Sequence, residues 1–504
     1  MTRVLGSVAS LASRAALASR ASVASVTTVS LLAAAALLAA CGDTPPGVTP
    51  GPDGGMPDPD GGMPPQPDGG TTVEDPEGCP PMYRQDLLPT YELRISEQEW
   101  AAMTDEFLHR AQREAEGLNP KPYHPADFTY VAGDQRIEVP DVRIRLKGNS
   151  SWWQTIAFDT NPKMQFVISF NETNPDGRFL GVRKLELDMP RTDLTYFKQR
   201  LGLRALRQMG VPAQCANNAR VVINGAYYGL YTNLERFDKE LLQRVYGHDD
   251  ADGDLWQGGR VIETNEDSFT WDRLDAFWGV QSVAQLDAVA DLDASLEEWA
   301  AEMMISDSDG YANGYANFMV YDHPVRGFIW MPQDLDTVFD KDFMPAETSP
   351  VFAPSAWPRW ELDWYHYLLV MNDRGGFDRF VNALATVRGK LDPAALQADI
   401  DAWRVQIADA VEDDPHRYVT TEEHEHQIDR VRHYITDRAV AIDAWLACRQ
   451  GSGGVDRDGD GYDLCHDCDE LHASVNPGVV EACNMVDDNC NGQVDDMPPA
   501  VACP

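Results

Sequence analysis

The alternation of apolar and polar residues predicts strands in the first part of the central chain. Apolar residues recur at every second position in 142–146 and 184–188, and residues 163–170 form another largely apolar run. Residues 219–231 alternate in the same way around an Asn-Gly pair, the strongest short-range signal of a two-residue hairpin turn. These patterns predict three strands followed by a β-hairpin.

Later segments have apolar residues three or four positions apart, a spacing that predicts helices. Asp193 is expected to cap a helix that runs to Met209 and ends at Gly210. A shorter amphipathic helix is expected from Phe237 to Val245. After residue 285 helices dominate, with expected ranges 287–304, 360–372, 375–388, 393–412 and 422–447. Strands first and helices later indicate an α+β fold.

One more hairpin is expected among these helices. Residues 317–321 and 327–331 are mostly apolar, and His323 to Arg326 form the turn between them. The apolar flanks indicate a hairpin that is held in a core, which makes its ends rigid. Because the two outer ends of a hairpin lie together, side chains before and after it are expected to converge.

Acidic and amide side chains cluster at both outer ends of this hairpin. They are Asp307, Asp309, Asn313 and Asn317 at the first end and Asp334, Asp336 and Asp340 at the second. Converging oxygens of this kind hold Mg²⁺ and its phosphates and can leave one carboxylate to accept a hydroxyl proton. The alternative is a pair of loops rich in Asp and Asn that bind nothing.

The N-terminal residues 1–40 read as a bacterial lipoprotein signal peptide. Three arginines precede an apolar run that ends at Leu38-Ala-Ala-Cys41. The run is too short for a comfortable membrane span, and small residues stand at the expected cleavage site. Cys41 would then become the first mature residue and carry the lipid. We therefore expect an exported protein, anchored in the cell envelope at the outer membrane or cell surface.

Composition divides the rest of the chain into three parts. Residues 41–78 are rich in Pro, Gly and Asp and are expected to form a disordered tether. Residues 79–448 hold nearly all the large apolar residues, enough for one large domain or a two-lobed one. Residues 449–504 are rich in Asp and Cys. Apart from Cys41 the chain has eight cysteines, an even number that fits disulfides in an oxidising compartment.

The net charge of −40 is spread over the whole mature chain. Nucleic-acid binding needs a basic surface, so this charge argues against it. It fits a protein that meets cations or basic partners, although simple solubility explains it equally well.

Several motifs of the central region occur in the order found in the CotH family, the spore-coat-protein-H-like atypical protein kinases. They are Arg145-Leu-Lys-Gly148-Asn-Ser, Lys163, Gly181-x-x-Lys184, Gly210-Val-Pro, Ile223-Asn-Gly-x-Tyr-Tyr-Gly-Leu-Tyr-x-x-x-Glu235, Asp309-Gly-Tyr and Pro332-Gln-Asp334-Leu-Asp336. The resemblance covers roughly residues 90–445. It implies a diverged protein-kinase-like fold and transfer of the ATP γ-phosphate, with Mg²⁺ or Mn²⁺, to Ser or Thr of a protein substrate at the cell surface or elsewhere outside the cytoplasm.

The resemblance also implies residue roles. Asp309 would be the catalytic aspartate. Asn317, or less favourably Asn313, would join Asp334 and Asp336 on the metal. Lys163 would contact a phosphate and Glu235 would support it. These assignments place Lys163, Glu235, Asn317, Asp334 and Asp336 at the cofactor.

One position departs from the family. The family usually has Pro-Trp-Asp-x-Asp, whereas this chain has Gln333 in place of the tryptophan. If the aromatic residue helps to hold the nucleotide base, Gln333 weakens ATP binding. The alternative function is then a catalytically dead CotH fold that serves as a calcium-stabilised surface binding or adhesion lipoprotein.

The tail carries a separate signal for Ca²⁺. Asp456, Asp458 and Asp460 precede Gly461 in the spacing of a calcium loop, and Asp467 stands at its twelfth position. A second copy of the pattern consists of Asp487, Asn489, Asn491 and Asp495. The tail resembles the short metal-binding module of exported myxobacterial-type proteins. A disulfide-stapled acidic tail with no fixed metal is the alternative.

Overall fold

The computed structural model describes residues 78–490 except 160, 315, 352–364, 452–453, 471, 485 and 487. The expected signal peptide 1–40, the lipid site Cys41 and most of the tether lie outside the described residues. Within the described residues, strands fill the first half and helices dominate the second, so the chain has mixed α and β structure as expected. None of the described helices is both long enough and apolar enough to cross a membrane.

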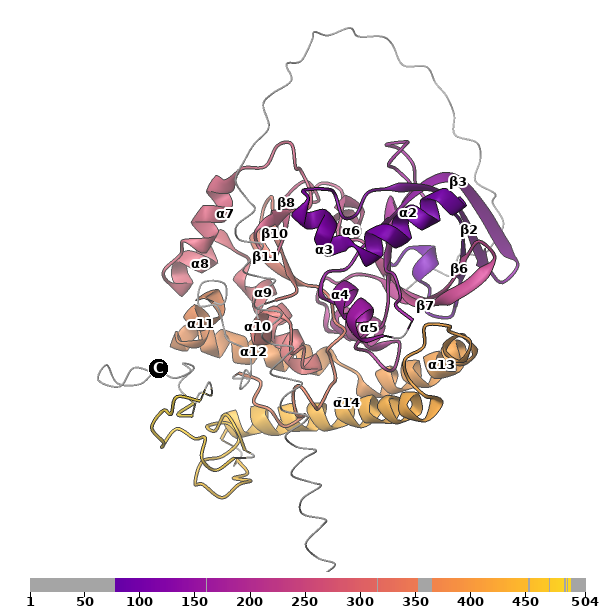
Figure 1. The fold of residues 1–504 in the computed structure, drawn as a ribbon. Helices are drawn as coiled ribbons and strands as arrows, with labels where there is room; N and C mark the ends of the chain where they lie inside the picture. The colour runs from indigo at the N-terminus through magenta and orange to yellow at the C-terminus, as the bar shows by residue number, and fades with distance from the viewer. Residues whose placement is uncertain are drawn as a thin grey trace, which may run out of the picture. The chain divides into compact units, whose positions relative to one another are not determined.

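The strands of the first half form a closed barrel (Figure 1). Neighbouring strands are antiparallel except for the pair β1–β6, which is parallel and closes the barrel. In barrel order the strands are β1 (Thr90–Arg94), β2 (His124–Ala132), β3 (Gln135–Leu146), β4 (Phe166–Ser169), β5 (Lys184–Asp188), β7 (Ala226–Glu235) and β6 (Ala216–Ile223).

The expected strands all belong to this barrel. Residues 142–146 form the end of β3, and 184–188 are β5. The β6–β7 hairpin turns at Asn224 and Gly225, which have φ values of 51° and 85°. Both residues lie in the left-handed region that a type I′ turn requires, so the Asn-Gly signal is confirmed. The strand expected at 163–170 is shorter, because only Phe166–Ser169 pair with both neighbours.

The expected second hairpin is also present, inside a four-stranded sheet. Strands β10 (Phe318–His323) and β11 (Gly327–Pro332) pair antiparallel, and every residue of β10 is buried. The sheet order is β11-β10-β8-β9. Strands β8 (Asp254–Gln257) and β9 (Val261–Ile262) were not expected, because they are too short for a periodic pattern.

The helices agree with expectation except at some boundaries. Helix α5 begins at Lys198 rather than directly after Asp193, but an Asp193 carboxylate oxygen accepts the Lys198 N–H at 2.6 Å. The single helix expected over 287–304 is two helices, separated where Ala290 bridges to Phe328 of β11. The remaining helices are α2 (Glu97–Leu108), α3 (Arg110–Ala115), α4 (Ser150–Phe158), α6 (Lys239–Tyr246), α7 (Trp271–Trp278), α8 (Val283–Val289), α9 (Leu292–Ile305), α10 (Tyr311–Gly314), α11 (Tyr365–Met371), α12 (Arg374–Lys390), α13 (Pro393–Glu412) and α14 (Thr421–Arg449).

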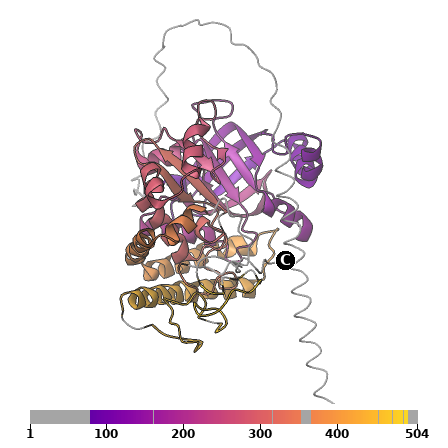
Figure 2. The same ribbon diagram turned by 90° about the vertical axis from the view of Figure 1, so that its left-hand side faces the viewer.

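Two large apolar cores stabilise the fold. One fills the barrel, and the other is formed by α5, α9, the β10–β11 hairpin and the helices α11–α14, some of which are seen from a second side in Figure 2. The Cys79–Cys215 disulfide links the segment before β1 to the start of β6. The two cysteines are 136 positions apart in the chain. A smaller core joins α6 to β8 and β10.

Candidate functional site

The candidate site lies where the β10–β11 hairpin opens. Phe318 and Pro332 are the last paired residues at this end of the hairpin. Just beyond them, the Gln333 N–H donates to the Asn317 carbonyl at 2.9 Å. Asn317 and Asp334 therefore flank the same open end. Both have left-handed backbone, with φ of 44° and 56°. Such strain in residues other than glycine is typical of functional sites.

Asp309 joins this end through a side-chain contact. The Asn317 amide Nδ2 donates to an Asp309 carboxylate oxygen at 2.8 Å. The Asp336 carboxylate accepts a hydrogen bond from the Thr192 hydroxyl. The structure thus brings Asp309, Asn317, Asp334 and Asp336 to one place, as the hairpin geometry predicts, although their chemical roles stay predictions.

Burial and mutual repulsion raise the pKa values of the carboxylates in this cluster. Burial and then the nearby Asp334 charge raise the pKa of Asp309 to about 6. Burial raises the pKa of Asp336 to about 6, and burial together with Asp336 raises that of Asp334 well above its ordinary value. Converging carboxylate and amide oxygens that repel one another are a suitable donor set for a divalent cation, which removes that repulsion.

A lysine that the sequence analysis missed stands beside this cluster. The Lys147 ammonium, just after β3, pairs with Glu186 at 2.6 Å and also with Asp188, both on β5. Lys147 lowers the pKa of Asp334, which places it close to the candidate metal ligands. The signal was available: Lys147 lies within the Arg145–Ser150 motif, and positions 186 and 188 share one face of a strand.

The structure gives Lys163 partners inside the protein. Its ammonium is buried, donates to the Leu230 carbonyl at 2.7 Å and pairs with Asp414 at 2.8 Å. It also lies 4.4 Å from the centre of the Tyr231 ring. These contacts pair the Lys163 charge inside the protein and favour a structural role for it over the expected contact with a phosphate.

Glu235 pairs with an arginine and a backbone N–H, and not with a lysine, among the described residues. Its carboxylate accepts the Cys215 N–H at 2.9 Å and pairs with Arg244 of α6 at 2.6 Å. Glu235 therefore fastens α6 to the barrel beside the Cys79 disulfide. Glu186, which bonds to Lys147 and also pairs with Arg236, occupies the position expected for Glu235.

Asn313 and Asp340, two other residues near the hairpin, have partners outside the cluster. Asn313 is buried and its Nδ2 donates to the Asp307 carbonyl at 2.7 Å, so Asn317 is the asparagine of the site. Asp340 pairs with Lys198 of α5 at 2.6 Å.

A buried pair of glutamates supports the segment that carries Asp309. The two oxygens of Glu302 accept the N–H groups of Tyr311 at 3.2 Å and Ala312 at 2.7 Å. Glu298, one turn earlier on α9, is fully buried and contacts Glu302, and neither of its oxygens meets a donor among the described residues. Burial and the Glu302 charge raise the pKa of Glu298 well above its ordinary value. This raised pKa favours the protonated form of Glu298, while both oxygens of Glu302 anchor the loop.

Gln333 lines a small pocket beside the site. The pocket measures about 200 Å³ and is lined by Gln257, Gly258, Arg260, Ala316, Asn317, Phe318 and Gln333. The Gln333 amide oxygen accepts from Gln257 of β8 at 3.3 Å. The turn between β8 and β9 thus approaches the position where the family has tryptophan.

The tail is stapled by disulfides. Cys448 at the end of α14 bonds to Cys465, and Cys468 bonds to Cys490. Asp456, Asp458 and Asp460 form one acidic group, and Asp458 also belongs to a second group with Asp467 and Glu470. In the second expected loop only Asn489 is described, and its N–H donates to Glu481 at 2.8 Å. Asp487, Asn491 and Asp495 lie outside the described residues.

A family model described as CotH kinase protein matches residues 144–442, more than half of the chain. The chain belongs to the CotH kinase family. This family implies the use of a nucleotide and a divalent metal. Residues 467–496 also match a family called Cu-binding MopE, which describes a metal-binding motif.

The comparisons with curated proteins and with solved structures give no evidence on function. No curated protein matches the chain. Among solved structures, the crystal structure of a Helicobacter pylori proinflammatory kinase, CtkA, aligns with a TM-score of 0.32 and 9% sequence identity, over 57% of this chain and 94% of that one.

Substitution of Lys163 and substitution of Lys147 should have opposite effects on stability and on activity. Lys163→Met strands the buried Asp414 charge, so it should lower the free energy of unfolding by about 3 kcal/mol without changing the ATP affinity of the folded protein. Lys147→Met should instead abolish ATP-dependent phosphorylation. Urea unfolding and nucleotide titration measure these effects. Normal phosphorylation by Lys147→Met would contradict this assignment.

The glutamate pair gives a second, matched prediction. Glu302→Gln can accept only one of the two loop N–H groups, so it should misplace Asp309 and reduce kcat by about 100-fold with little change in KM for ATP. Glu298→Gln keeps a donor toward Glu302 and should preserve kcat.

Stability against pH provides the control for this pair. Since the folded-state pKa of Glu298 is raised, its contribution to stability is complete at pH values below the unfolded pKa of 4.5 and is lost as pH rises toward the folded value. Glu298→Gln should flatten this fall. Equal kcat losses in both variants would show that the glutamates only fill space.

Proposed function

We propose that this CotH family member is an exported, lipid-anchored protein kinase that phosphorylates Ser or Thr of proteins at the cell surface or elsewhere outside the cytoplasm. The observation that carries the proposal is the Asp309–Asn317 contact at the open end of the β10–β11 hairpin, next to Asp334 and Asp336. A base and a metal-ligand set in one place are what phosphoryl transfer needs from a protein.

Each side chain has a definite task in this proposal. ATP with Mg²⁺ or Mn²⁺ supplies the phosphoryl group and neutralises charge. Asn317, Asp334 and Asp336 would hold the ion, and Lys147, fixed by Glu186, would face the phosphates. Asp309 would orient the substrate hydroxyl and accept its proton. Its raised pKa of about 6 makes it a stronger base than an ordinary aspartate while it remains ionised at neutral pH.

A diverged protein-kinase-like fold is part of the same proposal. The barrel strands β3 and β5 provide Lys147, Glu186 and Asp188, while the hairpin among the helices provides the acidic residues. The phosphates would therefore lie between a strand-rich part that supplies positive charge and a helix-rich part that supplies the metal ligands.

The cellular address is also proposed. The Leu38-Ala-Ala-Cys41 sequence supports a lipid on Cys41, and the Pro/Gly/Asp tether would hold the enzyme away from the membrane. The disulfides Cys79–Cys215 and Cys448–Cys465 are compatible with an oxidising compartment. The partners would be a protein substrate and a membrane, and not nucleic acid.

The C-terminal motif would serve a different purpose. We propose that it holds Ca²⁺ as a structural ion outside the phosphotransfer site. Asp456, Asp458, Asp460 and Asp467 would contribute carboxylate oxygens, which suit Ca²⁺.

The proposed roles predict distinct losses on substitution. Asp334→Ala should remove metal-dependent ATP binding and phosphorylation together. Asp309→Asn should keep ATP binding but lower kcat by about 10²–10⁴-fold, because only the proton acceptor is lost. ATP titration and radiolabel transfer to a generic basic protein, each with Mg²⁺ or Mn²⁺, measure these effects. Asp342→Asn is the matched control, because the Asp342 carboxylate is exposed and, among the described residues, pairs with Arg430 alone.

Failure of the wild type to bind ATP with either metal would overturn the kinase proposal. Gln333→Trp would then identify the reason, since restored binding would assign the loss to this position. In that case the alternative function, a surface binding or adhesion lipoprotein with a dead kinase fold, would take its place.

Lipid attachment predicts where the protein is found after cell fractionation. Cys41→Ser removes the thiol that carries the lipid, so this variant should move from the membrane fraction to the soluble fraction. Mass spectrometry of the wild-type N-terminus should show a lipid on Cys41. Membrane partitioning that is the same in both proteins would refute the anchor.

A further inference from the structure

The first acidic loop of the tail folds around its own N–H groups. One Asp456 oxygen accepts from Gly459 at 2.7 Å and the other accepts from Gly461 at 3.0 Å. Asp458 accepts from Asp460, and Asp460 accepts from Tyr462. These bonds use one oxygen each of Asp458 and Asp460 and leave their second oxygens free.

Four carboxylate oxygens of this region are buried without a hydrogen-bond donor among the described residues. They are one oxygen each of Asp458, Asp460, Asp467 and Glu470. Asp467 and Glu470 are only 3% and 8% exposed, so water does not compensate for the missing donors. Ligand oxygens of Asp458, Asp467 and Glu470 lie within 4.8 Å of one another, as do those of Asp456, Asp458 and Asp460.

The positive charge nearest in sequence points away from these oxygens. Arg457 lies inside the loop, but its guanidinium pairs with Glu347, 3.2 Å away. Burial raises the pKa of Asp467 to about 6 and that of Glu470 to about 7, and neighbouring aspartates add to both shifts. Unpaired buried carboxylates in contact are expensive unless a cation lies among them.

We propose that Asp456, Asp458, Asp460, Asp467 and Glu470 form one Ca²⁺ site, which Glu470 completes. Glu470 lies beyond the twelve-residue spacing of a calcium loop, so the sequence pattern does not assign it. Its buried position and its oxygen close to Asp458 and Asp467 make it a ligand of the same ion. The site deepens the structural role proposed for the tail and is independent of the kinase activity.

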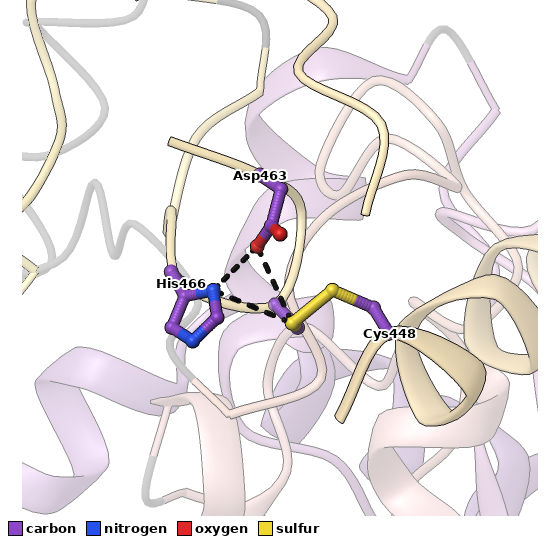
Figure 3. A group of neighbouring side chains, drawn as sticks. Cys448, Asp463 and His466 are labelled. Carbon is purple, nitrogen blue, oxygen red and sulfur yellow. Dashed lines mark hydrogen bonds and ion pairs between the residues drawn. A yellow bond between two sulfur atoms is a disulfide. The ribbon is translucent and has the colours of Figure 1, made fainter. Parts of the chain in front are cut away.

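The donor set favours Ca²⁺ over copper or zinc. All its side-chain donors are carboxylate oxygens, whereas copper and zinc prefer nitrogen and sulfur. A second group, formed by Cys448, Asp463, Cys465 and His466, has the donor types that zinc prefers (Figure 3). Its two sulfurs form a disulfide, however, and only a thiolate is a good metal ligand.

An ion at this site would also hold the tail against the catalytic domain. The other oxygen of Glu470 accepts the Arg457 N–H at 2.7 Å, and Arg457 reaches Glu347. The carbonyls on either side of Glu347, those of Ala346 and Thr348, accept from Arg438 of α14. Binding of Ca²⁺ would therefore order a contact between the tail and the segment that follows Asp340.

Terbium luminescence tests the site, because Tyr462 lies within the loop and can sensitise a bound Tb³⁺. The full chain should carry Asp334→Ala, which removes metal binding at the kinase site and separates the two proposals. We expect saturable Tb³⁺ binding that Ca²⁺ displaces. Glu470→Gln should weaken the Ca²⁺ affinity at least tenfold, and Asp458→Asn should do so as well, since Asp458 belongs to both acidic groups.

Asp463→Asn is the matched control. Asp463 is an acid of the same loop, but its carboxylate bonds to His466 at 2.5 Å, so its substitution should leave the Ca²⁺ affinity unchanged. Protection of residues 456–470 from proteolysis by Ca²⁺ should follow the same order. Ca²⁺ affinity that is equal in Glu470→Gln and wild type, or no displaceable Tb³⁺ in any variant, would overturn the proposal.

Discussion

The pairing of Phe318 with Pro332 is the constraint on which the candidate site depends. It closes the open end of one buried hairpin, and the hydrogen bond from Gln333 to Asn317 extends it by one step. Residues on either side of it are about fifteen positions apart in the chain yet share one small volume. Because the hairpin is buried between two cores, its ends cannot move apart without exposing aromatic side chains such as Phe318 and Trp330.

Repulsion among carboxylates is the recurring physical theme of this acidic chain. Examples among the described residues lie at the hairpin end, on α9 and in the tail. In the α9 pair Glu302 meets backbone donors, and the raised pKa of Glu298 favours its protonated form. The hairpin group has the Lys147 ammonium nearby, whereas the tail group has no neutralising side chain among the described residues. The tail group therefore depends more on a bound cation than the hairpin group does.

The sequence was most informative where the interactions are local. The Asn224-Gly225 turn, strand β5, helix α13 and the convergence of Asp309 with Asp334 all follow from patterns that span few residues. The contacts of Lys163 and Glu235 could not be predicted, and for one shared reason. Each depends on a partner far along the chain or on another element, such as Asp414, which lies 251 positions from Lys163. A lysine before a strand reads the same in sequence whether it faces a phosphate or a buried aspartate.

The Cys448–Cys465 disulfide has a consequence for how the tail would be lost. It links the last turn of α14 to a residue 17 positions later, so the connection between the catalytic domain and the tail is doubled over that stretch. If a protease cut the chain between these cysteines, the disulfide would keep the two fragments covalently linked. The tail would be released only after this disulfide was also reduced. The cleaved and the intact protein would therefore differ in apparent size only in gel electrophoresis under reducing conditions.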